Sequence, residues 1–230
     1  EKILIPGNPN NPTGRAISAT ELERLAEVCR ETHTWLMLDE GFQGFLDTRR
    51  EGSFVGNLLN GVGDHVILLN ALTKICSMAG LRLGYGIIPN AGLRERLEKF
   101  RQPWSVSAPA QAGGVAAFAV LADHSEGNLL EWTVKSLQTE RPRLAEKLEE
   151  LGFIVYPSQT NYLLFRSPDE DSRDYKQGCL EHGILIRACE NFEGLNRHYY
   201  RVAVRNRGEN ESLINILKEV QSEEKHDVNL

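Results

Sequence analysis

The chain has 230 residues, of which 41% are apolar and 25% are charged. This composition can bury one sizeable hydrophobic core or two modest ones and gives no sign of disorder. The formal net charge of -6 comes without a basic stripe, which argues against nucleic acid as a partner. No apolar run approaches membrane-spanning length, so we expect no membrane partner.

The four cysteines lie far apart, with no Cys-x-x-Cys pair and no histidine at ligand spacing: Cys29, Cys76, Cys179 and Cys189. This spacing predicts that the protein has no metal site. Reduced thiols are the simplest interpretation, and they favour a cytoplasmic protein. The chain begins at Glu1 without a methionine and enters a strand-like segment at once, which suggests a piece of something longer.

Residues 1 to about 120 alternate short apolar runs with helical patterns. Such alternation is typical of βαβ units on a largely parallel sheet. Thr20 and Glu23 predict a capping box at the start of the first helix. Strands are predicted at 3–5, 35–38, 66–69 and 84–88, and later helices over 91–100 and 108–121.

A long helical pattern over 128–151 contains Pro142, which predicts a kink or a break near Arg141. The remainder alternates again, with strands predicted at 153–156, 162–165, 184–187 and 200–204, a helix ending near 182 and a final helix from about 210. We therefore predict an α/β protein of two domains, residues 1–125 and a smaller one over 126–230.

Three polar clusters follow predicted strands, at the strand ends where open α/β sheets collect ligands: 8–14, 39–42 and 74–82. Lys74 follows the apolar run 66–69, so we expect its ammonium to lie where water is scarce. Desolvated lysines form Schiff bases, whereas a surface lysine in a loop is the simpler alternative. Asp39 follows four apolar residues, and a buried carboxylate there needs a cationic partner or several hydrogen bonds. A protonated ring nitrogen would serve as the cationic partner.

These clusters resemble, in combination and in order, the fold-type I pyridoxal-phosphate (PLP) enzymes of the class I/II aminotransferase group. The matching segments are the Asn-Pro-Thr-Gly turn at 11–14, Asp-Glu-Gly-Phe at 39–42, and Lys74 with Arg82 eight residues later. The resemblance covers essentially the whole chain. It implies a PLP-dependent transferase-like fold, with a mostly parallel sheet in a large PLP-binding domain and a smaller C-terminal α/β domain.

The same resemblance implies a role for each polar residue. Lys74 would hold the cofactor as a Schiff base, and Asp39 would pair with its pyridinium nitrogen. Asn11 would donate a hydrogen bond to the phenolic oxygen of the ring, and Arg82 would bind the cofactor phosphate. Phe42 stands where many members have a tyrosine, and Ala71 where a serine often helps hold phosphate, so phosphate binding would depend more on Arg82.

Two C-terminal segments, 184–195 and 200–205, are most similar to threonine-phosphate decarboxylases. That similarity implies a phosphorylated amino acid as substrate and decarboxylation of L-threonine O-3-phosphate to (R)-1-amino-2-propanol O-2-phosphate in cobalamin biosynthesis. Arg201 would bind the substrate carboxylate, and Arg187 would bind its phosphate or share the carboxylate. Arg205 could assist from the same strand face. The alternative is that Arg201 and Arg205 form an exposed ladder that pairs with acidic neighbours.

An aminotransferase acting on histidinol phosphate or another amino acid remains an alternative, because PLP cleaves whichever Cα bond stands perpendicular to its ring. Family members also carry an N-terminal third with a phosphate loop, a ring stacked on PLP and much of the dimer contact, and these residues do not contain it. We therefore expect a homodimer from the full-length protein and weak PLP binding, with little or no turnover, from the 230 residues alone. A noncatalytic fragment is the third hypothesis.

Overall fold

The computed structural model describes residues 2–46, 53–61, 63–168 and 171–223. Its internal contacts divide the chain into two compact units. The N-terminal unit comprises Glu1–Asn11 and Arg15–Lys135, and the C-terminal unit comprises Pro12–Gly14 and Ser136–Leu230. The division between Lys135 and Ser136 falls inside a helix, and the domain limits drawn from the sequence, 1–125 and 126–230, remain a proposal.

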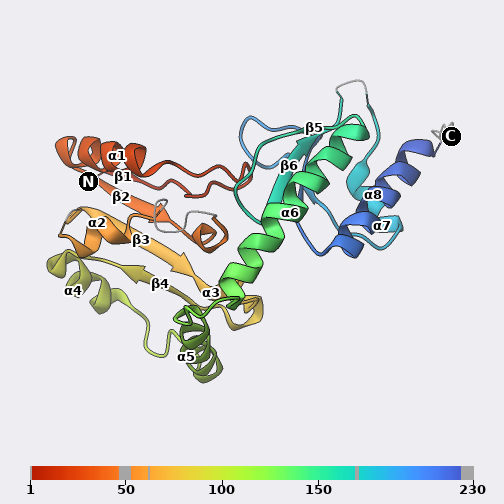
Figure 1. The fold of residues 1–230 in the computed structure, drawn as a ribbon. Coiled ribbons are helices and arrows are strands. Elements are labelled where there is room, and N and C mark those ends of the chain that lie inside the picture. The colour runs from red at the N-terminus through yellow and green to blue at the C-terminus, as the bar shows by residue number, and fades with distance from the viewer. Residues whose placement is uncertain (1, 47–52, 62, 169–170, 224–230) are drawn as a thin grey trace. The chain divides into compact units, whose positions relative to one another are not determined.

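The N-terminal unit is built on a sheet in the order β1-β2-β3-β4 (Figure 1). The first three strands run parallel and the last runs antiparallel to β3, which confirms the largely parallel sheet. The strands are β1 (Lys2–Leu4), β2 (Thr34–Asp39), β3 (Val66–Ala71) and β4 (Gly84–Ile87). All four overlap the predicted runs. The inner strands β2 and β3 contain the buried positions, whereas the edge strands β1 and β4 are largely exposed.

Helices connect and follow these strands: α1 (Ala19–Glu31), α2 (Val55–Leu59), α3 (Leu72–Ile75), α4 (Ala91–Phe100) and α5 (Ala108–Leu121), with 3₁₀ turns η1 (Gln43–Phe45) and η2 (Ala79–Leu81). The capping box predicted at Thr20 and Glu23 is wrong. Ser18 and Glu21 form it instead, since the Ser18 hydroxyl accepts from Glu21 N–H at 3.3 Å and the Glu21 carboxylate accepts from Ser18 N–H at 3.0 Å. Both pairs fit the same sequence pattern, so the pattern alone does not choose between them.

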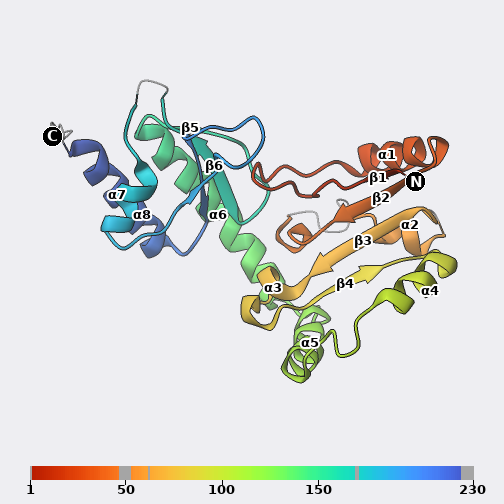
Figure 2. The same ribbon diagram turned by 180° about the vertical axis from the view of Figure 1, so that it is seen from behind.

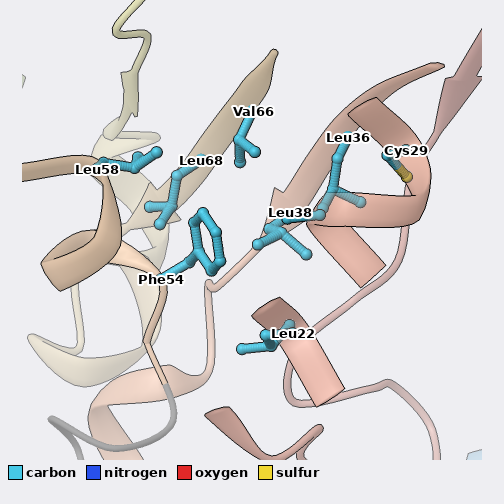
Figure 3. Close-up of a cluster of buried hydrophobic side chains, with 9 residues drawn as sticks. Leu22, Cys29, Leu36, Leu38, Phe54, Leu58, Val66 and Leu68 are labelled. Carbon is cyan, nitrogen blue, oxygen red and sulfur yellow. The ribbon is translucent and has the colours of Figure 1, made fainter. Parts of the chain in front are cut away.

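The core of the N-terminal unit lies between the sheet and the helices α1 and α2 (Figure 3). Alternate residues Leu36 and Leu38 of β2 and Val66 and Leu68 of β3 are 0% exposed, because successive side chains of a strand point to opposite faces. Phe54, just before α2, packs into this cluster. The helices contribute Leu22, Ala26 and Cys29 from α1 and Leu58 from α2.

The long helix α6 (Leu129–Glu150) passes through Pro142 without interruption. Of the kink or break predicted near Arg141, the break is therefore wrong. Leu137, Leu144 and Leu148 are buried at helical spacing on both sides of the proline. Burial of this stripe offsets the hydrogen bond that proline removes from the helix.

The C-terminal unit carries an antiparallel sheet in the order β5-β6-β8-β7 (Figure 2). Its strands are β5 (Ile154–Val155), β6 (Tyr162–Arg166), β7 (Arg187–Ala188) and β8 (Tyr199–Ala203), and its further helices are α7 (Tyr175–Glu181) and α8 (Arg207–Ser222). The strand predicted at 184–187 is much shorter than expected. Gly183 has φ +81° and Ile184 N–H donates to Cys179 O at 2.8 Å, so Ile184 closes the end of α7 instead of pairing in the sheet.

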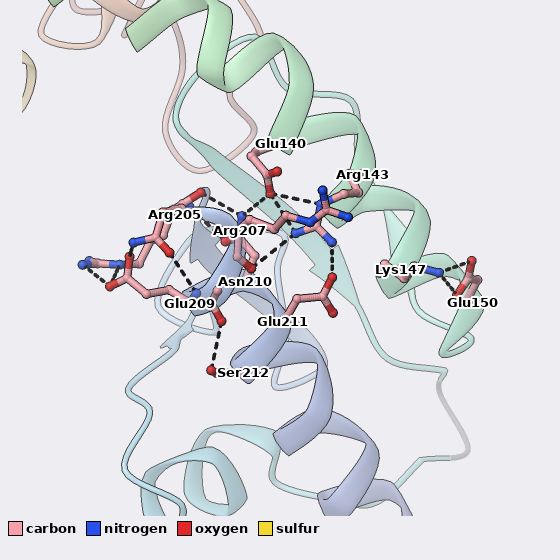
Figure 4. Close-up of polar contacts among 12 residues, drawn as sticks. Glu140, Arg143, Lys147, Glu150, Arg205, Arg207, Glu209, Asn210, Glu211 and Ser212 are labelled. Atoms are coloured by element: carbon pink, nitrogen blue, oxygen red, sulfur yellow. Dashed lines mark hydrogen bonds and ion pairs between the residues drawn. The ribbon is translucent and has the colours of Figure 1, made fainter. Parts of the chain in front are cut away.

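Polar side chains join α6 to α8 around Arg143 (Figure 4). Its guanidinium donates to the Glu140 carboxylate at 2.7 Å and also pairs with Glu211 of α8. Asn210 Nδ2 donates to the same Glu140 oxygen at 3.1 Å. The side chain of Asn206 caps α8, so this helix begins at Arg207, earlier than predicted, while its inward residues are buried as predicted: Leu213, Ile214, Leu217 and Val220.

Candidate active site

The chain that follows β1 lies along the end of β2 and holds the backbone of Asp39. Asp39 N–H donates to Pro6 O at 3.0 Å, and Asn8 N–H donates to Asp39 O at 2.8 Å. The side chain of Asn8 is fully buried and its Oδ1 accepts from Ile17 N–H at 2.8 Å. The loop that carries Asn11, whose own side chain is exposed, is therefore fixed at its base to the strand that ends in Asp39.

Asp39, Gly41 and Lys74 come together at the ends of β2 and β3. Gly41 N–H donates to Asp39 Oδ1 at 2.9 Å. A Cβ atom built on Gly41 would lie 3.1 Å from Asp39 Oδ1 and 3.7 Å from Lys74 Nζ. The carboxylate and the amine therefore both border the space that a side chain at residue 41 would occupy.

The aromatic ring of Phe42 completes the surroundings of the lysine. Lys74 Nζ lies 5.0 Å from the centre of this ring, a distance at which the ring face attracts a cation. Phe42 thus contacts the lysine through its π system, at the position where the resemblance led us to expect a tyrosine in many relatives.

The buried surroundings predicted for Lys74 and Asp39 are wrong, because both side chains are exposed. The apolar strand residues before them are buried as expected, among them Leu38 and Leu68. Each polar residue stands where its strand ends, and Lys74 has already entered the short helix α3. An apolar strand therefore does not predict that the polar residue after its last buried position is buried as well.

Arg82 ends the turn η2 in the left-handed conformation, with φ 54°. Its side chain is exposed, and Nη1 donates to Ala79 O at 3.1 Å. Tyr85 follows on β4, where burial, together with the negative charges of Glu40 and Cys76, raises the pKa of its phenol. A tyrosine with a raised pKa stays a neutral hydrogen-bond donor at neutral pH.

These residues fit the cofactor that the sequence predicts. The space over Gly41 is bordered by a primary amine, which can capture an aldehyde, and by a carboxylate, which can hold a protonated ring nitrogen. The exposed guanidinium of Arg82 is suited to phosphate. Among the residues that the structure describes, no group of three or more His, Cys, Asp and Glu could hold a metal ion.

In the C-terminal unit, Arg187 of β7 lies directly opposite Arg201 of β8. Opposite residues of antiparallel strands share one face of the sheet, so the two arginine side chains start from neighbouring positions on the same face. Arg187 Nη2 donates to Asn191 Oδ1 at 2.9 Å, and the guanidinium of Arg201 lies 5.1 Å from the ring centre of Tyr162. A hollow of about 570 Å³ adjoins Arg187 and is also lined by Lys176, Leu185, Ile186, Ala188, Glu190 and Asn191.

Arg205 does not belong to this pair. The strand β8 ends at Ala203, and Arg205 donates from Nε to Glu209 Oε1 at 2.7 Å. The exposed ion pair, one of the two alternatives for Arg205, is what the structure shows. The period-two argument failed because the strand stops before it reaches this residue.

Sequence reasoning missed two buried polar residues beside the candidate active site, Asn8 and Glu40, which are both 0% exposed. Glu40 was present in the motif at 39–42, yet only its neighbours received roles. The signal that was available is strand alternation: Glu40 has the same parity as Leu36 and Leu38, which predicts that it points to the core face.

Comparison with known proteins agrees with this geometry. The model of the family "Aminotransferase class I and II" matches residues 1–217. Threonine-phosphate decarboxylase from Salmonella typhimurium is 35% identical over 213 residues, which are 92% of this chain and 56% of that protein. Histidinol-phosphate aminotransferase from Nitratidesulfovibrio vulgaris is 33% identical over 95% of this chain and 55% of its own length. The chain thus spans little more than half the length of these relatives.

The fold is also that of a solved relative. The crystal structure of histidinol-phosphate aminotransferase from Clostridium acetobutylicum superposes with a TM-score of 0.85 at 30% identity, covering 96% of this chain and 64% of that one. This match confirms the predicted PLP-dependent transferase-like fold. Within the described residues, no helix has the length and apolar character needed to cross a membrane. The chain belongs to the aminotransferase class I and II family, whose cofactor is pyridoxal phosphate, as predicted from its motifs.

Proposed function

We propose that the full-length protein decarboxylates L-threonine O-3-phosphate to (R)-1-amino-2-propanol O-2-phosphate, a reaction of cobalamin biosynthesis. The observation that carries this proposal is the pair of arginines, Arg187 and Arg201, opposite each other on β7 and β8. Like charges directly opposite on a sheet are destabilising. A substrate that carries both a carboxylate and a phosphate would offset this repulsion with two anionic groups.

In this proposal each residue of the N-terminal unit has one task. Lys74 would hold PLP through its amine, and Asp39 would pair with the ring nitrogen of the cofactor. Asn11 would donate to its phenolic oxygen, and Arg82 would bind its phosphate. When bound, PLP supplies an electron sink for the pair of electrons left on Cα.

The arginines of the C-terminal unit orient the substrate. Arg201 binds the carboxylate and Arg187 the phosphate. By holding the carboxylate, the Arg201 guanidinium would orient the substrate and so select which bond to Cα breaks. The Lys74 amine would supply the proton that replaces the departing carboxylate on Cα.

The second candidate is an aminotransferase that acts on histidinol phosphate or another amino acid. It is supported by the aminotransferase relatives at 33% identity and, among solved structures, at 30%. Histidinol phosphate lacks a carboxylate, so one of the two arginines would then serve the carboxylates of the keto-acid acceptor. In this reaction Lys74 would move the Cα proton to C4′ of the cofactor instead of supplying a new one.

We also propose that the full-length protein is a cytoplasmic homodimer. All four cysteines are free, which suits a reducing compartment. In the described part of the N-terminal unit, α5 exposes Val115, Phe118 and Val120, which are 75%, 48% and 42% accessible. Apolar surface of this kind favours contact with other protein.

The test uses the full-length protein loaded with PLP, alongside a Lys74→Ala variant and a control variant, Lys99→Ala, in exposed α4. We expect carbon dioxide release from L-threonine O-3-phosphate without any keto acid, lost in Lys74→Ala and kept in Lys99→Ala. If PLP binds but amino-group transfer to 2-oxoglutarate occurs with no release, the protein is an aminotransferase and the decarboxylase proposal is wrong.

A further inference from the structure

Glu40 is a carboxylate in a place that packing alone does not explain. It points to the same face of β2 as Leu36 and Leu38 and is 0% exposed, while its neighbour Asp39 points to the other face, which is exposed. Burial raises the pKa of Glu40, although hydrogen bonds from Ser53 and Phe54 act in the opposite direction. A leucine would continue the apolar stripe without this cost.

The hydrogen bonds of Glu40 show what it holds. Oε2 accepts from the Ser53 hydroxyl at 2.6 Å, and Oε1 accepts from Phe54 N–H at 2.9 Å. Both carboxylate oxygens are thus bound to the two residues that lead into α2. Phe54 itself is 1% exposed within the core cluster, so the carboxylate is attached to a rigid part of the unit.

The backbone of Glu40 is fixed as well. Its N–H donates to Leu69 O of β3 at 2.8 Å, and its carbonyl accepts from Gln43 N–H of η1 at 3.0 Å. Glu40 therefore joins the ends of β2 and β3 to α2 and η1, directly between Asp39 and Gly41. Those two residues border the space that Lys74 Nζ also borders.

We propose that Glu40 is a positioning residue for the cofactor: by anchoring the turn 39–41 to α2, it sets where the Asp39 carboxylate stands relative to the Lys74 amine. Glu40 touches neither the cofactor nor the substrate in this role. The inference rests on the cofactor-binding role proposed for Asp39 and Lys74, and it is independent of which reaction follows. Small displacements of such supporting residues weaken binding because the groups they hold lose their alignment.

The experiment compares Glu40→Gln with Glu40→Leu in the full-length protein. A glutamine can keep both contacts, since Oε1 can accept from Phe54 N–H while Nε2 donates to Ser53 Oγ. Leucine has similar size but neither hydrogen bond, and it leaves the buried Phe54 N–H without its acceptor, which lowers stability. Leu217→Ala, which opens a cavity in the core of the C-terminal unit, is the control that loses stability without touching the turn 39–41.

Three measurements are made without substrate: the PLP dissociation constant by absorbance titration, the absorbance maximum of the bound cofactor, and the thermal unfolding midpoint. We expect Glu40→Gln to match the unaltered protein within a factor of about three. Glu40→Leu should bind PLP about tenfold more weakly than both the unaltered protein and Leu217→Ala, with a shifted absorbance maximum, when every titration is made well below the lowest unfolding midpoint. Glu95→Leu, in exposed α4, should change none of the three.

Two outcomes would overturn the proposal. One is normal PLP affinity and absorbance in Glu40→Leu, and the other is a loss of affinity that only follows a matching loss of thermal stability. If Glu40→Leu fails to fold, Ser53→Ala takes its place, since it removes one hydrogen bond and keeps the carboxylate. Ser53→Ala should raise the PLP dissociation constant by a smaller factor. Unchanged PLP affinity in Ser53→Ala would also overturn the proposal. Because no substrate is used, failure of the decarboxylase assignment leaves these readouts unaffected.

Discussion

At the scale of single residues, the candidate active site depends on a glycine, Gly41, which has no side chain. Gly41 lies where any Cβ would come within 3.1 Å of the Asp39 carboxylate and 3.7 Å of the Lys74 amine. The first distance is tighter than ordinary van der Waals contact. An alanine at residue 41 would therefore displace the carboxylate or narrow the space beside the amine.

We expect Gly41→Ala in the full-length protein to fold normally and to bind PLP about tenfold more weakly. The reason is local, because the methyl group would occupy space that the cofactor ring needs between Asp39 and Lys74. Absorbance titration with PLP measures the effect. The matched control is Gly56→Ala in α2, where a Cβ meets nothing within 4 Å.

The control should bind PLP like the unaltered protein and gain about 0.5–1 kcal/mol of unfolding free energy, because alanine loses less backbone entropy than glycine in a helix. Equal PLP affinity in the Gly41 and Gly56 variants would show that the space over Gly41 is not used by the cofactor.

The sequence predicted which residues would gather, but not their surroundings. Asp39 and Lys74 were identified from their order and from the strands before them, and the structure brings both to the border of one space. Their exposure was predicted wrongly, since side-chain burial at the end of a strand depends on what other segments cover it. Glu40 was missed for the opposite reason, because a carboxylate among leucines is rare and its partners, Ser53 and Phe54, are distant in the sequence.

At the scale of elements, the short segment Pro12–Gly14 packs with the C-terminal unit. Gly14 has φ +71°, and a Cβ there would lie 2.1 Å from Ser158 Oγ. The Gly14 carbonyl also accepts from Gln159 N–H at 2.8 Å. The segment therefore fits against the turn 158–160 only because residue 14 is glycine.

We expect Gly14→Ala to lower the free energy of unfolding by about 2 kcal/mol or more, from the left-handed backbone and the overlap with Ser158 together. Urea denaturation measures the loss. Gly152→Ala isolates the cost of the left-handed backbone, because Gly152 has φ +83° and a Cβ built on it would meet nothing within 4 Å. This variant should lose only about 1 kcal/mol of unfolding free energy.

The double variant Gly14→Ala with Ser158→Gly removes the overlap and should recover the difference between those two losses. If Gly14→Ala costs no more than Gly152→Ala, the packing of residue 14 against Ser158 contributes nothing to stability.

The contact between α6 and α8 predicts a pH dependence. Hydrogen bonds from Arg143 hold the pKa of Glu140 below its usual range, and Asn210 acts in the same direction. The side chains of Glu140 and Arg143 are only 15% and 18% exposed. Because the pKa is lower in the folded state, the stabilisation is present above the unfolded pKa and is lost as pH falls through the folded value.

We therefore expect the unfolding free energy to fall as pH drops below about 4.3, and Glu140→Gln to be roughly 1 kcal/mol less stable at pH 7 with a smaller loss on acidification. Urea denaturation from pH 7 to pH 3 measures both. Glu149→Gln, exposed on the same helix, is the control. Parallel pH curves for the Glu140 variant and the unaltered protein would rule out this linkage.

Elements were predicted well where burial is periodic and poorly where they end. The ranges of α4 and α5 agree with the predicted ones, because capping residues mark their starts. The length of the strand at 184–187 was overestimated, because an apolar run also fits the end of α7. There, Ile184 N–H donates to Cys179 O. Of the two alternatives for Arg205, the strand-face one fails because β8 ends at Ala203. Short apolar runs do not distinguish these cases, since only long-range pairing decides between them.

At the scale of the whole molecule, the described part of the N-terminal unit leaves much apolar surface exposed. The edge strand β1 and the residue after it expose Ile3, Leu4 and Ile5 at 51%, 41% and 60%. Further along, Phe100 is 83% and Trp104 is 96% exposed. An open apolar edge strand and large apolar side chains with this much exposure are features that folded proteins normally cover.

We expect the 230 residues alone to bind PLP weakly, because the groups proposed to hold it, among them Lys74, Asp39 and Arg82, are all exposed and exposed charges contribute little affinity each. The relatives are longer, since the matched region is 56% of the Salmonella typhimurium protein.

Absorbance titration of the 230-residue chain beside the full-length protein, with Lys74→Ala of each as control, measures the difference. We expect at least a tenfold higher dissociation constant for the shorter chain, together with a red-shifted tryptophan emission, since Trp104 and Trp132 are 96% and 64% exposed. High PLP occupancy of the 230-residue chain at micromolar cofactor, lost in its Lys74→Ala variant, would show instead that these residues form a complete cofactor site without further protein.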